Sequence, residues 1–300
     1  MSNNDNELGL PLVASGKVRD LYEVDSETLL FVASDRISAF DVIMANTVPG
    51  KGKILTLMTA HWFEFLKSQM PDLKTHFVSL DLPSTVPAAV RSQYKGRSMV
   101  VRKLKVFPIE AIVRGYITGS AWSSYKKTGR VNGVKIDAAL QESQQFPVPL
   151  YTPSTKAELG QHDENISIEQ AAEIVGSKYA KRIEALAIGI YTTARDYAAQ
   201  KGIIIADTKF EFGLDEQTDE VVLIDEVLTP DSSRFWDAKS YKVGQGQASF
   251  DKQYLRDWLK ANDLKDKQDV AMTEEVVRET KKKYEEAFRL ITGKNIDDVA

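Results

Sequence analysis

The stretch spanning residues 202–237 constrains the fold more than any other, because it concentrates strand-like apolar runs and charge. Residues 203–206 are uniformly apolar, which is too hydrophobic for a half-exposed strand. In residues 207–212 charged and bulky side chains then alternate with period two, the period of a β-strand. The pattern predicts one strand with a charged face formed by Asp207, Lys209 and Glu211.

A second apolar run, residues 221–224, follows a polar loop and ends in Asp225. Strand register decides whether Glu211 and Asp225 converge, because a one-residue slip sends a side chain to the other face of the sheet. If they converge beside Lys209, two carboxylates suit Mg²⁺, which takes one or two carboxylates plus substrate phosphates. The alternative is a solvated hairpin whose charges pair across strands, each pair contributing about 0.2–1 kcal/mol. Residues 229–234 add hydroxyls and a guanidinium suited to a phosphate, which favours a ligand site.

Composition excludes several classes of protein. The chain has 300 residues, 43% of them hydrophobic, so one large or two moderate domains with a sizeable core are expected. A net charge of −4 argues against broad binding of nucleic acid or anionic membranes. The absence of cysteine removes disulfides and thiolate chemistry, and the three histidines are widely spaced. No basic, apolar leader or bilayer-length apolar run is visible, so a soluble, cytoplasmic protein is expected.

The N-terminal part predicts strands, a glycine loop and a hairpin over residues 12–33. Gly16 followed by Lys17 could cradle phosphates, although the Walker and GxGxxG patterns are absent and such a pair is usually structural. The next polar loop offers ligand-facing groups that are equally common as turn formers, namely Asp35, Ser38 and Asp41.

Helices are predicted by three-four spacing and by their capping residues. The capping box of Ser167 and Gln170 starts one helix, and Thr273 with Gly293 bounds the last. The expected ranges are 54–66, 117–129, a helix from 167, 177–200, 251–260 and 273–292. Together with the strands, these helices give an α/β (α+β) fold class, and a boundary between two lobes is placed near residue 112.

Six motifs occur in order along the chain. They are GKVRDLYEV, SDRISAFDV, FPIEAIVRGYITGSAW, TPSTKAELGQHDENIS, IIIADTKFEFG and LIDEVLTPDSSRFW. In combination they are specific, and from about Gly16 to Ser249 the chain resembles the SAICAR synthetase family (phosphoribosylaminoimidazole-succinocarboxamide synthases), above all its longer, fungal-type members.

The resemblance implies an ATP-dependent ligase of de novo purine synthesis that joins L-aspartate to the carboxylate of carboxyaminoimidazole ribonucleotide. The reaction would pass through an acyl phosphate and release ADP and phosphate. The implied fold has two lobes, as in protein kinases and ATP-grasp enzymes, with ATP between a β-rich lobe (1–112) and an α/β lobe (113–300). The implied ligands are ATP, Mg²⁺, L-aspartate and the carboxylated nucleotide; no nucleic acid or membrane partner is expected, and a monomer is the working hypothesis.

The resemblance also implies roles for individual residues. ATP would be bound by Gly16, Lys17, Arg19, Glu110 and Glu211. Catalysis would involve Lys156, Lys209 and Asp225, and Glu211 with Asp225 would hold Mg²⁺. The nucleotide substrate would contact Asp35, Ser38, Asp41, Arg114, Ser120, Ser232 and Arg234.

Two other classes stay open on the residues alone. A kinase would share the metal carboxylates, but the triplet starting at Glu211 resembles DFG only superficially and the sequence has no HRD loop. The second class is a nucleotide-binding module without catalytic activity.

Overall fold

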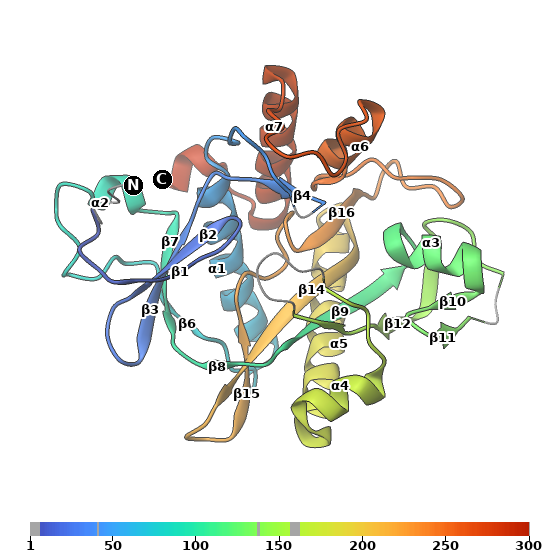
Figure 1. The fold of residues 1–300 in the computed structure, drawn as a ribbon, viewed down its shortest axis with the longest axis horizontal. Helices are drawn as coiled ribbons and strands as arrows, with labels where there is room; N and C mark the ends of the chain where they lie inside the picture. The colour runs from blue at the N-terminus through green and yellow to red at the C-terminus, as the bar shows by residue number, and fades with distance from the viewer. Residues whose placement is uncertain (1–6, 41, 137–138, 157–162, 300) are drawn as a thin grey trace. The chain divides into compact units, whose positions relative to one another are not determined.

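The computed structural model describes residues 7–40, 42–136, 139–156 and 163–299. Contacts between residues divide the chain into two compact units. Figure 1 labels the helices and strands of both. The first unit contains residues 1–63, 75–104 and 254–300, and the second contains residues 64–74 and 105–253. Residues 254–300 group with the N-terminal residues and residue 112 lies within a strand, so these two units do not divide at residue 112.

The first unit contains an antiparallel sheet of five strands in the order β1-β2-β3-β7-β6. The strands of this unit are β1 (Leu12–Ser15), β2 (Arg19–Glu23), β3 (Thr28–Ala33), β4 (Ser38–Ala39), β5 (Val42–Ile43), β6 (Phe77–Ser79) and β7 (Ser98–Arg102). Leu30 and Val32 of β3 are buried in one apolar cluster with Leu8 and Leu82, which anchors the sheet. The predicted strands and hairpin over residues 12–33 are thereby confirmed.

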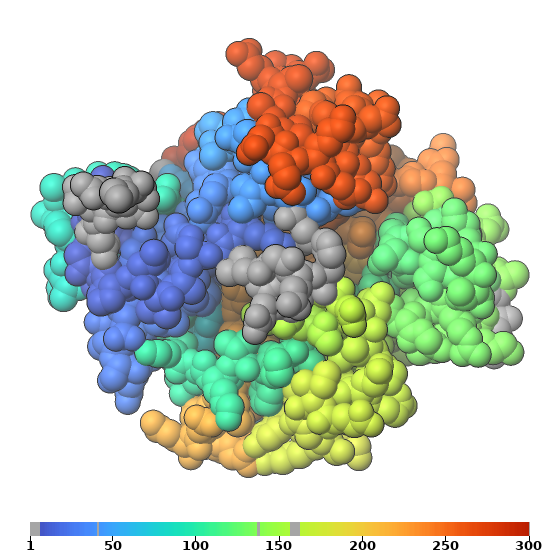
Figure 2. Space-filling model, in the orientation of Figure 1, coloured from blue at the N-terminus to red at the C-terminus, as the bar shows by residue number. Residues whose placement is uncertain are grey.

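The helices associated with this unit come from both ends of the chain. They are α1 (Lys51–Gln69), α2 (Arg91–Tyr94), α6 (Gln253–Ala261), α7 (Glu274–Thr292) and the 3₁₀ helix η1 (Ile296–Val299). The Asn46 side chain pairs with the backbone of Met272 in both directions, at 2.9 and 2.8 Å, which ties the N-terminal segment to the start of α7. Figure 2 accordingly shows orange C-terminal and blue N-terminal surfaces side by side within this unit. Thr273 and Gly293 bound α7 as predicted.

The second unit contains a seven-stranded sheet within the described part of the chain, with the path β12-β9-β14-β15. Strand β13 pairs with β9, and both β16 and β8 pair with β14. The strands of this unit are β8 (Lys105–Val106), β9 (Ile109–Tyr116), β10 (Arg130–Val131), β11 (Val134–Lys135), β12 (Gln145–Tyr151), β13 (Ser154–Thr155), β14 (Ile203–Asp215), β15 (Glu220–Ile224) and β16 (Ser233–Asp237). Every pairing is antiparallel.

Helices α3 (Gly119–Thr128), α4 (Ile168–Val175) and α5 (Ser177–Gln200) complete the second unit. The predicted capping box of α4 is present, since Ser167 and Gln170 exchange hydrogen bonds of 2.8 and 3.2 Å. Helix α5 packs against β14 and β9. Gly115 of β9 permits this packing, because a Cβ there would lie 1.8 Å from the hydroxyl of Tyr191 on α5.

Strand β14 organises the second unit, as the 202–237 stretch predicted, but two details differ. Gly213 continues the strand instead of starting the loop. The run predicted as a turn-forming phosphate loop ends in a strand, since β16 starts at Ser233 and lies along β14. Across the described residues, no helix is both long and apolar enough to cross a membrane.

Candidate active site

Two groups of charged side chains lie on β14 and its neighbouring strands in the second unit. The first, called here the lysine–carboxylate cluster, consists of Glu110, Lys156, Lys209, Glu211 and Asp225. The second, called here the arginine pair, consists of Arg114 and Arg234, which share Asp207. Pairing of β9 and β16 with opposite edges of β14 brings Glu110, Arg114 and Arg234 to the charged residues of β14. Lys156 follows β13, and Asp225 follows β15.

In the lysine–carboxylate cluster each lysine forms an ion pair with a different glutamate. Lys209 pairs with Glu110 on the adjacent strand β9, and Lys156, just after β13, pairs with Glu211. Glu110 is only 5% exposed and also accepts a 3.2 Å hydrogen bond from Ser154 Oγ. These two ion pairs therefore link β14 to β9 and to the residue that follows β13.

The backbone conformation of Asp225 brings the second metal-ligand candidate to this cluster. Glu211 lies opposite Ile224, so a regular continuation of β15 would turn Asp225 to the other face. Asp225 instead adopts the left-handed conformation, with φ of 63°, immediately after the strand ends. Its carboxylate consequently lies close enough to Glu211 and Lys209 to influence both electrostatically.

The crowding of carboxylates perturbs the titration of this cluster. Burial and the negative charge of Asp225 raise the pKa of Glu211, and the two lysines oppose that shift only in part. Burial alone would lower the pKa of Lys209, but the charges of Glu110 and Glu211 raise it above the ordinary lysine value. Lys209 is therefore a fixed cation at neutral pH, and Glu211 is a carboxylate that a further positive charge would stabilise.

The donor set of Glu211 and Asp225 fits Mg²⁺. Across the described residues no group of three or more His, Cys, Asp or Glu side chains is arranged to hold a metal ion. Two carboxylates without a third ligand match the way Mg²⁺ binds, through one or two carboxylates, water and substrate phosphates. Burial and the nearby Asp225 carboxylate raise the pKa of Glu211, so a bound cation would stabilise its charged form.

Arg114 is buried and Arg234 is partly buried, and the two guanidiniums share one carboxylate. Arg114 is 4% exposed, donates from Nε to Thr152 Oγ1 at 2.9 Å and lies 3.5 Å from Asp207 Oδ2. Arg234 donates to the same Asp207 oxygen. Arg234 therefore pairs with a residue of the neighbouring strand, and Asp231, close to it in sequence, pairs with Lys252 at 3.0 Å.

The start of helix α3 lies against Arg234. A Cβ on Gly119 would come within 2.5 Å of an Arg234 terminal nitrogen, so only glycine allows this contact. Thr118 gives α3 no side-chain cap, and Ser120 is exposed in the first turn. Arg234 Nε is buried without a hydrogen-bond partner in the described part of the chain. Free helix N–H groups beside an unsatisfied guanidinium are suited to an anion.

Ser232 is the remaining predicted substrate residue of this unit, and its hydroxyl is engaged locally. Ser232 Oγ accepts a 3.1 Å bond from the Thr229 backbone N–H, and Ser232 O accepts one of 3.0 Å from the N–H of Lys209. The following residue, Ser233, contacts Thr208 Oγ1 at 2.8 Å. This segment therefore fixes where β16 starts, and with it the position of Arg234.

In the first unit the predicted phosphate loop is closed by its own backbone. Gly16 N–H donates to Arg19 O at 2.7 Å, and Gly16 O accepts from Arg36 at 3.2 Å. The Arg19 guanidinium lies over the ring of Phe31, 5.3 Å from its centroid. Gly16, Lys17 and Arg19 thus belong to one β1–β2 turn.

Asp35 has a structural task in the same unit. Its two carboxylate oxygens accept 2.9 Å bonds from the N–H groups of Gly50 and Gly52 at the start of α1. Ser38 lies in the short strand β4, opposite Ile43. Asp41 lies outside the described residues. The observed bonds of Asp35 anchor a helix, a function that its sequence context did not suggest.

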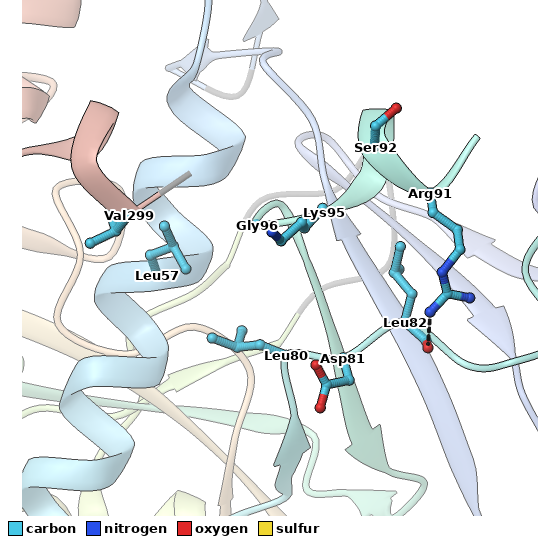
Figure 3. A pocket seen from close by; sticks show the side chains of 9 residues that line it. All are labelled: Leu57, Leu80, Asp81, Leu82, Arg91, Ser92, Lys95, Gly96 and Val299. Atoms are coloured by element: carbon cyan, nitrogen blue, oxygen red, sulfur yellow. Dashed lines mark hydrogen bonds between the residues drawn. The ribbon is translucent and has the colours of Figure 1, made fainter. Parts of the chain in front are cut away.

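A cavity of about 310 Å³ also lies in the first unit, away from any predicted site residue (Figure 3). Its walls are formed by Leu57, Leu80, Asp81, Leu82, Arg91, Ser92, Lys95, Gly96 and Val299. The Arg91 guanidinium donates to the carbonyls of Leu82 and Pro83 at 2.8 and 2.7 Å. Arg91 therefore holds the 82–83 loop and leaves the cavity mostly apolar.

The mixed α/β fold thus carries a carboxylate-rich group and an arginine-rich group on one sheet, an arrangement suited to phosphorylated ligands and their cations. The family model described as SAICAR synthetase matches residues 12–273. Phosphoribosylaminoimidazole-succinocarboxamide synthases of Cyberlindnera jadinii and Saccharomyces cerevisiae are 58% and 56% identical, over 98% and 95% of this chain and 97% and 95% of theirs. The chain belongs to the SAICAR synthetase family.

Solved structures agree with this assignment. A structure described as the SAICAR synthase of Saccharomyces cerevisiae complexed with SAICAR is 52% identical, covers 98% of both chains and has a TM-score of 0.87. A SAICAR synthetase described as in complex with ADP is 27% identical, covers 94% of this chain and 98% of that one, and has a TM-score of 0.70. The mixed α/β fold with antiparallel sheets is thus the family fold.

Proposed function

We propose that this chain is an ATP-dependent carbon–nitrogen ligase that forms SAICAR from carboxyaminoimidazole ribonucleotide and L-aspartate in de novo purine biosynthesis. The observation that carries the proposal is the opposite charge balance of two adjacent groups on β14. The lysine–carboxylate cluster has more carboxylates than lysines. In the arginine pair, two arginines share one aspartate. The names of the relatives, one complexed with SAICAR and one with ADP, support the same reaction.

The arginine pair would bind the phosphate of the nucleotide substrate. Arg234 has an unused buried Nε, and the uncapped start of α3 adds backbone N–H groups and the Ser120 hydroxyl. Arg114 is oriented by Thr152, so its guanidinium is already positioned before substrate arrives. Asp207 keeps both guanidiniums charged and in place. Because one carboxylate serves two arginines, the group keeps an excess of positive charge.

The lysine–carboxylate cluster would activate the substrate carboxylate. A carboxylate is a poor acyl donor, and phosphoryl transfer from ATP to it is catalysed mainly by positioning and charge neutralisation. Mg²⁺ held by Glu211 and Asp225 would neutralise the phosphates of ATP. Lys156 and Lys209 would then turn from their glutamates towards the transferred group, and Glu110 would keep Lys209 charged.

The remaining assignments extend this scheme. By the family resemblance we assign Gly16, Lys17 and Arg19 to the ATP phosphates, and these three residues lie together in the β1–β2 turn. The kinase-like, two-lobed description of the fold belongs to the same proposal. Asp35 and Ser38 remain assigned to substrate contacts by the family resemblance, with Asp35 also capping α1. The working hypothesis is a cytoplasmic monomer.

One assay tests the function. ADP release is measured with ATP and Mg²⁺ in the presence of L-aspartate, of carboxyaminoimidazole ribonucleotide, or of both. Release that requires both supports the ligase. Release with a hydroxyl acceptor in place of aspartate would identify a kinase, and nucleotide binding without turnover would identify a binding module.

A further inference from the structure

A buried ion pair anchors the turn that leads to Arg234, and the reaction scheme above does not use it. Lys252 Nζ lies 3.0 Å from Asp231 Oδ2, and the two side chains are 10% and 1% exposed. Asp231 belongs to the turn before β16, whereas Lys252 comes just before α6. The pair therefore ties the start of β16 to a segment that is distant in sequence.

The segment that carries Lys252 has a fixed position in the second unit. Residues 248–252 run along β16 on the edge away from β14, where Trp236 forms an antiparallel bridge with Ser249. The backbone N–H of Phe235 donates to Asp251 Oδ2 at 2.9 Å, and Asp251 is buried. Lys252 therefore reaches Asp231 from a backbone that is itself bonded to β16.

The turn on the other side of the ion pair is closed by its own hydrogen bonds. Thr229 Oγ1 accepts from the N–H of Asp231 at 3.2 Å, and Thr229 O accepts from the N–H of Ser233 at 2.9 Å. These local bonds fix the shape of the turn, and the ion pair with Lys252 fixes the turn against the segment beside β16. Because Arg234 follows the turn directly, a rotation of the turn would displace its guanidinium.

Stability alone gives little reason for a buried ion pair at this position. The loss of hydration of two buried charges offsets much of their attraction, and apolar side chains of similar size in place of such a pair are often neutral or stabilising. Recognition of a phosphate by a guanidinium, in contrast, depends on direction, because two parallel hydrogen bonds have to form. The Lys252–Asp231 pair is therefore better suited to orienting Arg234 than to stabilising the fold.

We propose that the ion pair of Lys252 and Asp231 positions Arg234 and thereby sets the affinity of the enzyme for the phosphate of its nucleotide substrate. Both are positioning residues, which act through Arg234 and not by contact with the substrate. They hold the turn so that the Arg234 guanidinium lies against Asp207 and the start of α3. This inference rests on the proposed function, because it takes Arg234 as a phosphate ligand.

The test measures Michaelis constants and melting temperatures of the full chain. Lys252→Met removes the charge but keeps most of the side-chain length, and the Michaelis constant for carboxyaminoimidazole ribonucleotide should rise about tenfold while that for ATP stays nearly unchanged. Lys252→Arg keeps the charge and should stay within about twofold of wild type. Asp231→Asn added to Lys252→Met should raise the melting temperature again, because no buried charge is left unpaired, but the Michaelis constant should stay high.

The double variant separates positioning from stability, since a purely structural pair would recover both quantities together and overturn the proposal. If Lys252→Met fails to fold, the double variant decides, and a wild-type constant for the nucleotide in it also overturns the proposal. Lys105→Met breaks the exposed ion pair with Glu216 in the same unit and is the matched control, with wild-type values expected.

Two outcomes distinguish this inference from the function on which it rests. A wild-type constant in folded Lys252→Met, together with a raised constant in Arg234→Lys, would overturn the positioning role and leave the proposed function intact. Wild-type constants in both variants would move the phosphate away from the arginine pair and overturn the positioning role as well. Release of ADP that does not depend on the nucleotide in the wild-type enzyme would overturn the proposed function itself.

Discussion

The lysine–carboxylate cluster and the arginine pair are built on the same strands but differ in their charge balance. Both use β9 and β14, and Asp207, Lys209 and Glu211 follow one another at every second position of β14. Two residues along a strand span roughly 7 Å, so the two groups are close neighbours. In one group three carboxylates outnumber two lysines, and in the other two guanidiniums share one carboxylate.

This difference shows how one sheet can hold ligands of opposite sign. Burial and the Asp225 carboxylate disfavour the ionised form of Glu211 and raise its pKa, so this group favours a bound cation. An excess of guanidiniums favours an anion, and Arg234 still has an unused donor for it. The predictions below change one group at a time.

The largest effect is expected from Glu211→Gln, which keeps the shape of the side chain but removes the charge proposed to hold Mg²⁺. Turnover should fall by about 100-fold or more, equivalent to about 2.7 kcal/mol, while thermal unfolding stays close to wild type. Steady-state rates across a Mg²⁺ titration measure this. Glu220→Gln on the neighbouring β15 is exposed and is the matched control, with wild-type rates expected. Near-normal turnover of the Glu211 variant at low Mg²⁺ would remove Glu211 from the metal site.

A substitution on β9 where helix α5 packs against it should disturb the lysine–carboxylate cluster and the arginine pair together. In Gly115→Ala the new Cβ would lie 1.8 Å from the Tyr191 hydroxyl and 2.7 Å from its ring carbon, so β9 or α5 must shift. We expect a loss of about 2–3 kcal/mol in the free energy of unfolding, measured by urea denaturation. Activity should fall as well, because β9 carries both Glu110 and Arg114.

Two further variants define the cause of that loss. Adding Tyr191→Phe should recover part of the stability, although it removes the 2.8 Å bond to Ile205 O. Gly246→Ala, where a Cβ would meet nothing within 4 Å, should be neutral. Equal stability of Gly115→Ala and wild type would show that the strand adjusts without cost.

The sequence predicted the elements of the second unit more completely than the contacts of its site. Helix α5 and the capping box of α4 were predicted from spacing and capping residues, because both signals are local. Strand β14 was predicted from its apolar run and alternation. Arg234 and Asp207 were both singled out, but their pairing was not predicted, because the pair forms only when β16 lies along β14.

Convergence of Glu211 and Asp225 could not be predicted for a different physical reason. The register of β14 with β15 would have separated them, and the left-handed backbone of a single residue, Asp225, brings them together. Asp35 likewise gave no sign in the sequence that it would cap α1, fifteen residues further along the chain. Both features depend on tertiary packing, which local patterns do not record.

The arginine pair can be tested without removing charge. Arg234→Lys keeps the cation but loses the planar guanidinium that can hold a phosphate with two parallel bonds. The Michaelis constant for carboxyaminoimidazole ribonucleotide should rise about tenfold, equivalent to about 1.4 kcal/mol, with that for ATP nearly unchanged. Arg278→Lys on α7, an exposed residue, is the control and should be silent. A wild-type constant in folded Arg234→Lys would move the phosphate away from this pair.

The smallest effect is expected from the ion pair of Lys178 and Asp219, which belongs to the second unit and is exposed to solvent. Hydrogen bonds from Lys178 and Tyr179 lower the pKa of Asp219, whereas the same contacts raise the pKa values of Lys178 and Tyr179. The contribution of Asp219 to the stability of the folded state is therefore fully present above the pKa of aspartate in the unfolded chain, about 3.9. It is lost as the pH falls through the lower pKa of Asp219 in the folded protein. Asp219→Asn should lower the melting temperature slightly at pH 7, and the difference in melting temperature from wild type should vanish in strong acid. A difference that persists in strong acid would mean that Asp219 acts through packing and not through its charge.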